Sequence, residues 1–374
     1  MTTSEPVLTA PELYINTPWP QLPPIDFQGI PGIGITPGQN LWATWYGGGA
    51  GEGPDNDVYV TTRDATTGQW AKPWMLVHHP HPNVRVYDPT MWTDPQGRLW
   101  LFWAQCMSFK INNSWDGRSG VWGIYCEKPD TNPYEWSAPR RFCDGVMMNK
   151  PTIDKKGRWL MPVSMWKCKP YHPDVNADRL GPHAVIYDPR TDSVTMNNPA
   201  EIDFPIFDEH HVIELSDGRW SSWCRTVNPN YLAAVSYSSD EGKTWTKGVD
   251  SSIPCPNSRF YMGVLDSGNW LLISHDLTKL VLGENKVYPP RTHLTAWISS
   301  DEGATWQGGL LLDERIKVSY PDGVQAKDGL IHIIYDRERY SSREILLTSF
   351  REEDVLSGNT NNIRRETVST YVTA

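Results

Sequence analysis

The chain has 374 residues, and its 34 lysines and arginines are outnumbered by 44 aspartates and glutamates, which gives a formal net charge of −10. This charge and the lack of any Lys/Arg-rich run argue against a nucleic-acid partner. No stretch approaches about 18 consecutive apolar residues, so we expect no membrane partner. The N-terminus lacks a basic segment followed by an apolar one. We therefore expect a cytoplasmic protein, or a secreted or periplasmic one if a leader has been removed.

The composition favours an all-β architecture with many turns. The 19 tryptophans and 31 prolines are well above average usage. Six cysteines show no Cys-x-x-Cys or similar ligand spacing, and these are Cys106, Cys126, Cys143, Cys168, Cys224 and Cys255. We therefore expect reduced, mostly buried cysteines, and neither a metal site nor a cofactor.

A turn followed by an aromatic or aliphatic strand recurs six times along the chain. In chain order, its turn glycines are Gly38, Gly97, Gly157, Gly218, Gly268 and Gly329. Successive glycines are 59, 60, 61, 50 and 61 residues apart, which suits one four-stranded sheet with its loops. Glycine fits these turns because the backbone needs a positive φ there. The repeats predict an all-β fold, a six-bladed β-propeller over residues 25–350, whose closure leaves no long exposed sheet edge.

The two ends of the chain are expected to pack on this ring. Only one clear strand, residues 344–350, follows the last turn glycine. We therefore predict that the N-terminal segment, residues 1–24, supplies the outer strand that closes the ring. The C-terminal tail, residues 351–374, is predicted to pack on the propeller, and the segment FREEDVLSG is compatible with a short helix there.

A second repeated motif supports the propeller. The octapeptides SSDEGKTW, residues 238–245, and SSDEGATW, residues 299–306, share one pattern, and TTRDATTGQW, residues 61–70, is a degenerate relative. Asp and Gly stabilise such a turn, and the Trp packs the hairpin into its blade. Calcium binding is the alternative, but each turn offers fewer than the 6–8 oxygens that calcium prefers. The two octapeptides resemble the Asp-box of the sialidase superfamily, and the chain is similar to that family along nearly its whole length.

Equivalent positions in the six repeats should face one site, because the innermost strand of each propeller blade lines the central channel. Nine residues before the turn glycine stand Gly29, Asp88, Met148, Glu209, Arg259 and Tyr320. Seven residues after it stand Trp45, Ala104, Ser164, Arg225, His275 and Asp336. Charged and polar side chains gather in the last three blades, which predicts a carbohydrate site at the mouth of the channel. Ion pairs that stabilise the channel are the alternative.

The sialidase resemblance implies roles for several of these positions. DEHHVIELSDGRWSSWCRT is similar to the family's strand pair with a Glu before and an Arg after the turn, here Glu209 and Arg225. RTHLTAWISSDEGATW resembles the segment with a further carboxylate-binding arginine, here Arg291, and VSYPDG the segment with the nucleophilic tyrosine, here Tyr320. IIYDRER places Asp336 where the family has an acid that holds an arginine.

The implied chemistry is consistent with the residue types. A tyrosine titrates near pH 10, so a neighbouring carboxylate, Glu209, would have to take its proton during attack. Two arginines can bind a substrate carboxylate through planar, bidentate hydrogen bonds. The general acid is expected in the loop WYGGGAGEGPDND after the first blade's second strand, with Asp55 first and Glu52 next. A solvated glycine-rich loop is the alternative there.

The chain departs from the family in the segment FQGIPGIGI. Gly29 stands where sialidases carry an arginine that completes a triad around the substrate carboxylate. Because a glycine opens space and removes a charge, we expect weak or absent turnover of a standard sialoside. Arg85 or Arg259 could replace the lost arginine, or the substrate could be another sugar.

Four further residues are candidates for substrate binding, namely Asp88, Lys150, His210 and His275. Lys150 is expected to contact a substrate anion or to pair with Asp88. His210, beside Glu209, is expected to act as a base near neutral pH or to be a hydrogen-bonding rim residue.

These observations predict a sialidase-like exo-glycoside hydrolase that removes a terminal acidic sugar. Two other functions remain open on the same propeller. One is a polysaccharide lyase or non-sialic glycosidase acting on glycans that contain uronic acid or rhamnose. The other is a propeller that binds sugar without cleaving it.

Overall fold

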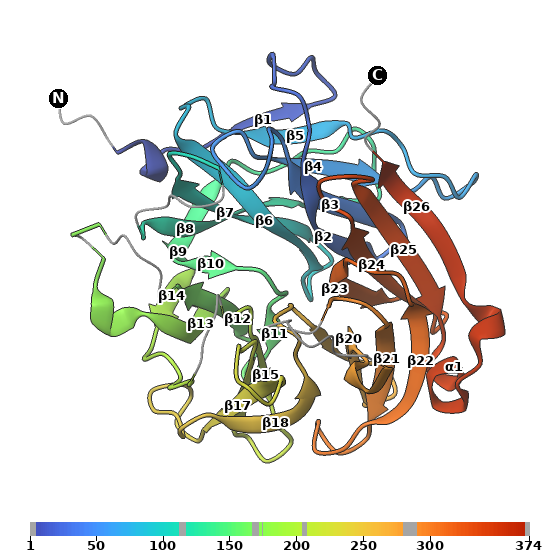
Figure 1. Ribbon diagram of the computed structural model, residues 1–374. Coiled ribbons are helices and arrows are strands. Elements are labelled where there is room, and N and C mark those ends of the chain that lie inside the picture. Colours follow the sequence, from blue (N-terminus) through green and yellow to red (C-terminus); the bar gives the residue numbers. More distant parts are fainter. Residues whose placement is uncertain are drawn as a thin grey trace.

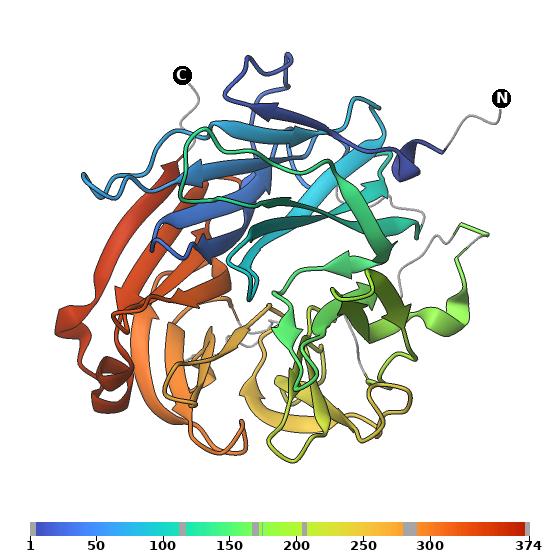
Figure 2. The ribbon, with the colours of Figure 1, turned by 180° about the vertical axis from the view of Figure 1, so that it is seen from behind.

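The computed structural model describes residues 5–111, 117–166, 172–173, 175–203, 208–279 and 290–370. These residues form six antiparallel sheets that follow one another around a central axis in chain order (Figure 1). The first blade therefore lies beside the last one, and the view from behind shows the same closed ring (Figure 2). The predicted six-bladed β-propeller is confirmed.

The first three blades are built from the N-terminal half of the chain. From the channel outward, blade one contains β2 (Gln28–Ile35), β3 (Leu41–Gly47), β4 (Asp57–Thr62), β5 (Met75–His78) and β1 (Glu12–Ile15). Blade two contains β6 (Val84–Thr93), β7 (Leu99–Met107), β8 (Ser119–Cys126) and β9 (Arg140–Asp144). Blade three contains β10 (Val146–Met147) and β11 (Thr152–Ile153), which both pair with β12 (Trp159–Met165), then β13 (Gly181–Asp188) and β14 (Ser193–Met196).

The last three blades have four strands each. Blade four contains β15 (His211–Glu214), β16 (Trp220–Cys224), β17 (Leu232–Ser238) and β18 (Val249–Pro254). Blade five contains β19 (Tyr261–Val264), β20 (Trp270–His275), β21 (Leu294–Ser299) and β22 (Gln307–Asp313). Blade six contains β23 (Val318–Gln325), β24 (Ile331–Arg337), β25 (Glu344–Phe350) and β26 (Arg364–Thr370).

Helices are short in the described part of the chain. The helix expected near the C-terminus is α1 (Glu352–Ser357), and Gly358 ends it in the left-handed conformation, with φ 67°. Four 3-10 turns are η1 (Pro6–Leu8), η2 (Ala177–Arg179), η3 (Leu277–Lys279) and η4 (Thr360–Asn362). None of the helices among the described residues is long and apolar enough to cross a membrane.

The six turn glycines lie between the two inner strands of their blades, as the repeat predicts. Five of them, all except Gly38, have a positive φ between 76° and 89°. In blade one the neighbouring Gln39 takes the left-handed conformation instead, with φ 68°. The register counted from Gly38 is therefore wrong by one residue. Because side chains alternate along a strand, Trp45 points into the core and Tyr46 takes the channel position.

Both Asp-box turns have the expected structure. The carboxylate of Asp240 accepts hydrogen bonds from the backbone N–H of Thr244 at 2.9 Å and from its hydroxyl at 2.7 Å. Asp301 makes the same pair of bonds to Thr305 at 2.8 and 2.6 Å. These turns are therefore structural elements of the blades.

The ring is not closed by the N-terminal segment, and that prediction is wrong. β1 adds a fifth, outermost strand to blade one, whereas the C-terminal strand β26 supplies the outer strand of blade six. The β26 sequence RRETVST has no apolar alternation, and only Val368 is buried, so its strand signal is weak.

Carboxylates of blade six instead bind the inner backbone of blade one. Asp336 accepts a hydrogen bond from the N–H of Ile30 at 2.7 Å, and Asp322 accepts one from the N–H of Ile33 at 2.8 Å. The buried carboxylate of Asp322 also pairs with Lys150 of blade three. One carboxylate thus connects three blades at the centre of the ring.

The expectation of reduced, mostly buried cysteines is confirmed for the five that the structure describes. All five are free thiols; four are buried, and Cys143 is half-buried. Cys168 lies outside the described residues.

Candidate active site

Left-handed backbone at the channel positions turns side chains toward the axis. Ile30, Asp88 and Tyr320 each precede a proline and have φ values of 54°, 48° and 55°. Strand pairing shifts register at each of these points, which marks a β-bulge. Glu209 is also left-handed, with φ 42°. Such strain in non-glycine residues is characteristic of functional sites, and bulges re-aim side chains beside them.

Tyr320 and Glu209 form the hydrogen-bonded couple that the sequence predicts. The hydroxyl of Tyr320 donates to Oε1 of Glu209 at 2.8 Å. Nη1 of Arg225 lies 2.8 Å from the same hydroxyl and 2.5 Å from the same carboxylate oxygen. All three side chains are buried. Oε2 of Glu209 accepts no hydrogen bond within the described part of the chain, so this carboxylate can still take a proton.

The environment of Tyr320 keeps its phenol protonated in the resting protein. Burial raises the pKa of Tyr320 above its usual value of 10, although the neighbouring Arg225 opposes that shift. A preformed phenolate is therefore unavailable at neutral pH. Glu209 is the carboxylate in contact with the phenol hydroxyl, so it is placed to accept that proton.

Arg259 lies 5.3 Å from the centroid of the Tyr320 ring, and three further arginines from different blades also surround this ring. The guanidinium carbons of Arg225, Arg291 and Arg339 lie 6.0, 5.2 and 4.2 Å from the ring centroid. Nη2 of Arg291 donates to the carbonyl of Asn257 at 2.7 Å. We call these three arginines, together with Tyr320 and Glu209, the Tyr320 cluster.

Arg339 is the member of the cluster that sequence reasoning missed. It lies in the turn between β24 and β25, and its Nε donates to Asp336 Oδ2 at 2.8 Å. Asp336 therefore holds an arginine, as the family resemblance implies. A Cβ at Gly29 would lie only 2.8 Å from the Cγ and Cδ of Arg339. Arg339 thus fills the space expected beside Gly29. This arginine is the last residue of the segment IIYDRER.

Arg259 and Arg85 do not take the place vacated at Gly29. Arg259 is buried, and its guanidinium donates to four backbone carbonyls, among them those of Tyr320 and Pro321 at 3.0 and 3.1 Å. It therefore fixes the bulge that carries the tyrosine. Arg85 instead donates to Asn56 at 2.9 Å and to the Tyr46 hydroxyl at 3.0 Å.

Glu52, rather than Asp55, faces the Tyr320 cluster from the loop between β3 and β4. A carboxylate oxygen of Glu52 lies 3.7 Å from Nη1 of Arg339, and the other lies 3.6 Å from Nη2 of Arg85. Its side chain is 36% exposed, so it lies at the rim. Asp55 is exposed and lies against the backbone of Gly48 and Gly49. Of these two carboxylates, Glu52 is therefore the one that lies beside the Tyr320 cluster.

Asp88 is a buried carboxyl next to this rim. Burial is the main cause that raises its pKa to about 7, with Arg85 opposing the shift and Glu52 and Glu209 adding to it. Its Oδ1 has no hydrogen-bond partner among the described residues. A carboxyl that is partly protonated at neutral pH can donate a hydrogen bond to a sugar hydroxyl.

Replacing Asp88 by asparagine should stabilise the protein at neutral and higher pH. A raised pKa means that the folded state prefers the protonated acid, so wild-type stability falls as pH rises from about 4 to about 7. The asparagine variant does not lose stability in this way. The difference in free energy of unfolding between the variant and wild type should therefore grow by up to about 4 kcal/mol over that pH range. Urea unfolding of both proteins at pH 4 and pH 8 measures it. A stability difference that does not change with pH would contradict the assignment.

Three other candidates make contacts outside the cluster. Lys150 pairs with Asp322 and not with Asp88. The ring nitrogens of His210 lie 3.2 Å from the Ser164 hydroxyl and 2.9 Å from the His183 carbonyl. Burial lowers the pKa of His210 to about 3, so it is a neutral structural residue and not a base.

His275 is also buried and lies at the end of β20. Its Nδ1 is 2.9 Å from the Thr292 carbonyl, and burial lowers its pKa to about 4. Met148, the channel position of blade three, contributes only its carbonyl, which accepts a hydrogen bond from Arg259 at 2.7 Å. The polar side chains of the site therefore come from blades one, two, four, five and six, and blade three contributes only this backbone carbonyl.

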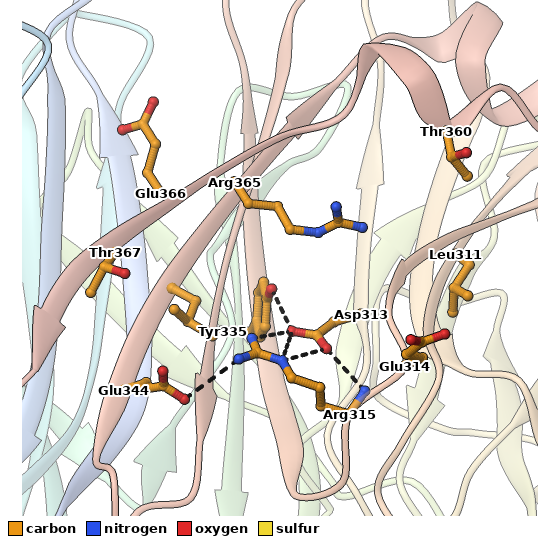
Figure 3. Close-up of a pocket in the computed structure, with 11 residues that line it drawn as sticks. Leu311, Asp313, Glu314, Arg315, Tyr335, Glu344, Thr360, Arg365, Glu366 and Thr367 are labelled. Atoms are coloured by element: carbon orange, nitrogen blue, oxygen red, sulfur yellow. Dashed lines mark hydrogen bonds and ion pairs between the residues drawn. The ribbon is translucent and has the colours of Figure 1, made fainter.

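A separate cavity of about 630 Å³ lies between blades five and six (Figure 3). Several of its polar side chains contact one another: Arg315 lies 2.6 Å from Asp313, and the Tyr335 hydroxyl donates to Asp313 at 2.9 Å. None of the residues that line it belongs to the Tyr320 cluster. Among the described residues, no group of three or more His, Cys, Asp or Glu side chains is placed to hold a metal ion.

The fold and the cluster define a six-bladed propeller with a tyrosine–carboxylate couple enclosed by arginines. A family model of the BNR repeat-like domain matches residues 39–333, and the chain belongs to that family. Its propeller is of the sialidase-like type. No curated protein matches the chain in sequence.

Solved structures with the same fold include sialidases. The Hadza microbial sialidase Hz136 superposes with a TM-score of 0.66 at 19% identity, covering 88% of this chain and 66% of that one. This chain thus spans just under two thirds of that protein. A leech intramolecular trans-sialidase, complexed with 2,7-anhydro-Neu5Ac, has a TM-score of 0.62 at 11% identity, covering 91% and 71%. A protein of unknown function from Dyadobacter fermentans DSM 18053 has a TM-score of 0.61 at 14% identity, covering 85% and 93%. These identities establish the fold alone.

Proposed function

We propose that this protein is an exo-acting glycoside hydrolase that removes a terminal acidic sugar. The observation that carries the proposal is the contact between the Tyr320 hydroxyl and Glu209, which Arg225 also contacts. A tyrosine bonded to a buried carboxylate can act as a nucleophile, and its neutral oxygen approaches an anionic sugar without charge repulsion. The surrounding arginines favour a substrate that carries a carboxylate.

The first step forms a covalent sugar–tyrosine intermediate. The oxygen of Tyr320 attacks the anomeric carbon, the phenol proton passes to Glu209, and the bond to the leaving group breaks. Glu52 donates a proton to the departing oxygen, because it lies at the rim where a leaving group would extend into solvent. Arg225 stabilises the charge that moves between the tyrosine and the carboxylate.

The second step releases the sugar. A water molecule attacks the anomeric carbon from the side that the leaving group vacated, and Glu52 takes its proton. The bond to Tyr320 breaks, and the tyrosine recovers its proton from Glu209. Two inversions at one carbon return the original configuration, so the released sugar should retain the anomeric configuration of the substrate.

A lyase is less well supported by the same geometry. Proton abstraction by a tyrosine and a histidine would need an imidazole in the site, but the candidates His210 and His275 are buried and bonded elsewhere. A purely sugar-binding propeller would have no use for a tyrosine bonded to a carboxylate that can accept its proton. Released products distinguish all three functions.

The test is a screen of the purified protein against fluorogenic sialosides, uronosides and rhamnosides, with product analysis. The proposal expects a free reducing sugar acid with retained anomeric configuration. An unsaturated uronate that absorbs in the ultraviolet would establish a lyase. Binding without any product would establish a sugar-binding protein and reject the hydrolase.

Replacing Glu52 by glutamine should impair hydrolysis according to the leaving group. For a natural glycoside, whose leaving alcohol needs a proton, kcat/KM should fall by about 10²–10⁴-fold, the usual contribution of a general acid. For an aryl glycoside with an acidic phenol as leaving group, the first step needs little protonation and should be nearly unaffected. Steady-state kinetics on both substrates measure the difference.

Asp55→Asn is the matched control for this experiment, because Asp55 lies on the same loop but is exposed. It should leave both rates within about threefold of wild type, as an exposed substitution away from a site does. A leaving-group-dependent loss in Asp55→Asn, with none in Glu52→Gln, would reverse the assignment of the acid.

A further inference from the structure

Gly29 and Arg339 form a complementary pair across the junction of the first and last blades. A Cβ at Gly29 would approach the Cγ, Cδ and Nε of Arg339 to 2.8, 2.8 and 2.9 Å. Real Cβ atoms essentially never come this close to a neighbour. The arginine side chain therefore crosses the volume that any other residue at position 29 would occupy.

The position of Arg339 is fixed by buried partners on the side away from the rim. Its Nε donates to Asp336 at 2.8 Å, and its Nη2 donates to the Ser319 hydroxyl at 3.1 Å. Asp336 is fully buried and is itself bonded to Ser319 at 2.7 Å. The backbone carbonyl of Arg339 accepts a hydrogen bond from the N–H of Gln28 at 3.2 Å. The guanidinium is thus oriented before any ligand arrives.

The outer edge of this guanidinium retains donors for a ligand. Arginine has five N–H groups in a fixed plane. Two of those of Arg339 are used by Asp336 and Ser319, and Nη1 makes no hydrogen bond within the described part of the chain. The 3.7 Å between Nη1 and Glu52 is an ion-pair distance rather than a hydrogen bond. Its side chain is 12% exposed, so the edge can be reached from solvent.

Positive charge is in excess around Tyr320. Four arginines, Arg225, Arg259, Arg291 and Arg339, lie within 6.0 Å of its ring centroid. Three carboxylates face these four arginines: Glu209 contacts Arg225, Asp336 contacts Arg339, and Glu52 lies 3.7 Å from Arg339. Arg291 has only a carbonyl, that of Asn257, as hydrogen-bond partner among the described residues. An anion placed between Arg291 and Arg339 would complete the charge balance.

We propose that Arg339 is the specificity-determining residue that binds the carboxylate of the sugar, in the place that Gly29 leaves open. This inference rests on the proposed function and narrows its substrate to sugars whose carboxylate lies at or beside the anomeric carbon. Arg339, which belongs to the last blade, thereby supplies a positive charge beside Gly29 of the first blade. Turnover of a sialoside, expected to be weak from Gly29 alone, is then compatible with this chain.

Binding of free sugar acids tests the proposal independently of catalysis. The probes are N-acetylneuraminic acid, its 2,3-dehydro analogue and glucuronic acid, each compared with the analogue in which the carboxylate is reduced to a hydroxymethyl group. By calorimetry, Arg339→Ala should weaken binding of the preferred acid by about 10–100-fold, the effect of one charge-assisted contact. Binding of the reduced analogue should change by less than about threefold.

Two further variants separate a lost contact from a damaged fold. Arg337→Ala, two residues before Arg339 at the end of β24 but bonded to Glu344, should bind all the probes like wild type. The double variant Gly29→Arg with Arg339→Ala should recover at least part of the lost affinity, because the new arginine enters the vacated volume. Melting curves of all variants establish that they fold.

Two outcomes would overturn the inference. One is an Arg339→Ala variant that binds the acids as tightly as wild type. The other is a wild-type protein that binds none of the three acids, or only glucuronic acid, whose carboxylate is not beside the anomeric carbon. If such a protein hydrolyses a uronoside, the proposed hydrolase stands and only the assignment of Arg339 fails; if it hydrolyses neutral glycosides alone, the acidic substrate of the proposed function fails as well.

Discussion

Replacing Tyr320 by phenylalanine should abolish hydrolysis while leaving the fold and the binding of a sugar acid intact. The substitution removes one oxygen, the atom that would attack the anomeric carbon, and leaves the ring that packs among the arginines. Loss of a nucleophile that works as a unit with its base costs most of the catalysed rate, so kcat should fall by at least about 10³-fold. Single-turnover hydrolysis of the preferred glycoside measures this loss.

The control for this variant is Tyr261→Phe. Tyr261 is another tyrosine beside the channel, on β19, but its ring lies near Lys150 at 5.9 Å rather than near Glu209. It should retain wild-type kinetics. A Tyr320→Phe protein that keeps more than about a tenth of the wild-type kcat, with an unchanged dissociation constant for the sugar acid, would exclude Tyr320 as nucleophile.

Replacing Asp322 by alanine should strongly destabilise the propeller. The carboxylate joins blades one, three and six, because it bonds the N–H of Ile33 and the ammonium of Lys150. Its loss leaves a largely buried ammonium without a counter-ion and an amide without an acceptor. Breaking one partner of a buried ion pair typically costs about 3–5 kcal/mol. Urea unfolding should show a loss of this size.

Two companion variants make this second prediction specific. Asp322→Ala combined with Lys150→Met removes both charges and should regain a large part of the stability, because the unpaired charge is gone. Asp328→Ala removes a carboxylate that is 65% exposed in the same blade and should cost less than about 1 kcal/mol. Equal losses in Asp322→Ala and in the double variant would show that the ion pair does not hold the blades.

The fold was predictable because its signal is repeated six times. Each turn needs a residue with positive φ, and five of the six turns satisfy that need with glycine at the counted position. The error in blade one arose where Gln39 adopted the left-handed conformation beside Gly38. The closing strand was misjudged because β26 is exposed along most of its length. An exposed strand needs few apolar residues, so its sequence shows little apolar alternation.

The candidate site was predictable only where position in the repeat determines position in space. Glu209, Arg225 and Tyr320 stand at counted channel positions, and their side chains meet. Arg339 lies in a turn, three residues beyond the last counted position, and reaches the cluster through the length of its side chain. The repeat pattern does not predict how far this side chain extends. The choice between Glu52 and Asp55 likewise depends on a loop conformation that composition does not determine.

Trapping the covalent intermediate would decide whether Tyr320 attacks the sugar. The reagent is a glycosyl fluoride of the released sugar acid with a second fluorine beside the anomeric carbon. That fluorine slows breakdown of the intermediate, because it disfavours the oxocarbenium-like transition state. Mass spectrometry of the digested protein should show one added sugar on the peptide that contains Tyr320. An adduct on another residue, or active enzyme that forms no adduct, would show that Tyr320 is not the nucleophile.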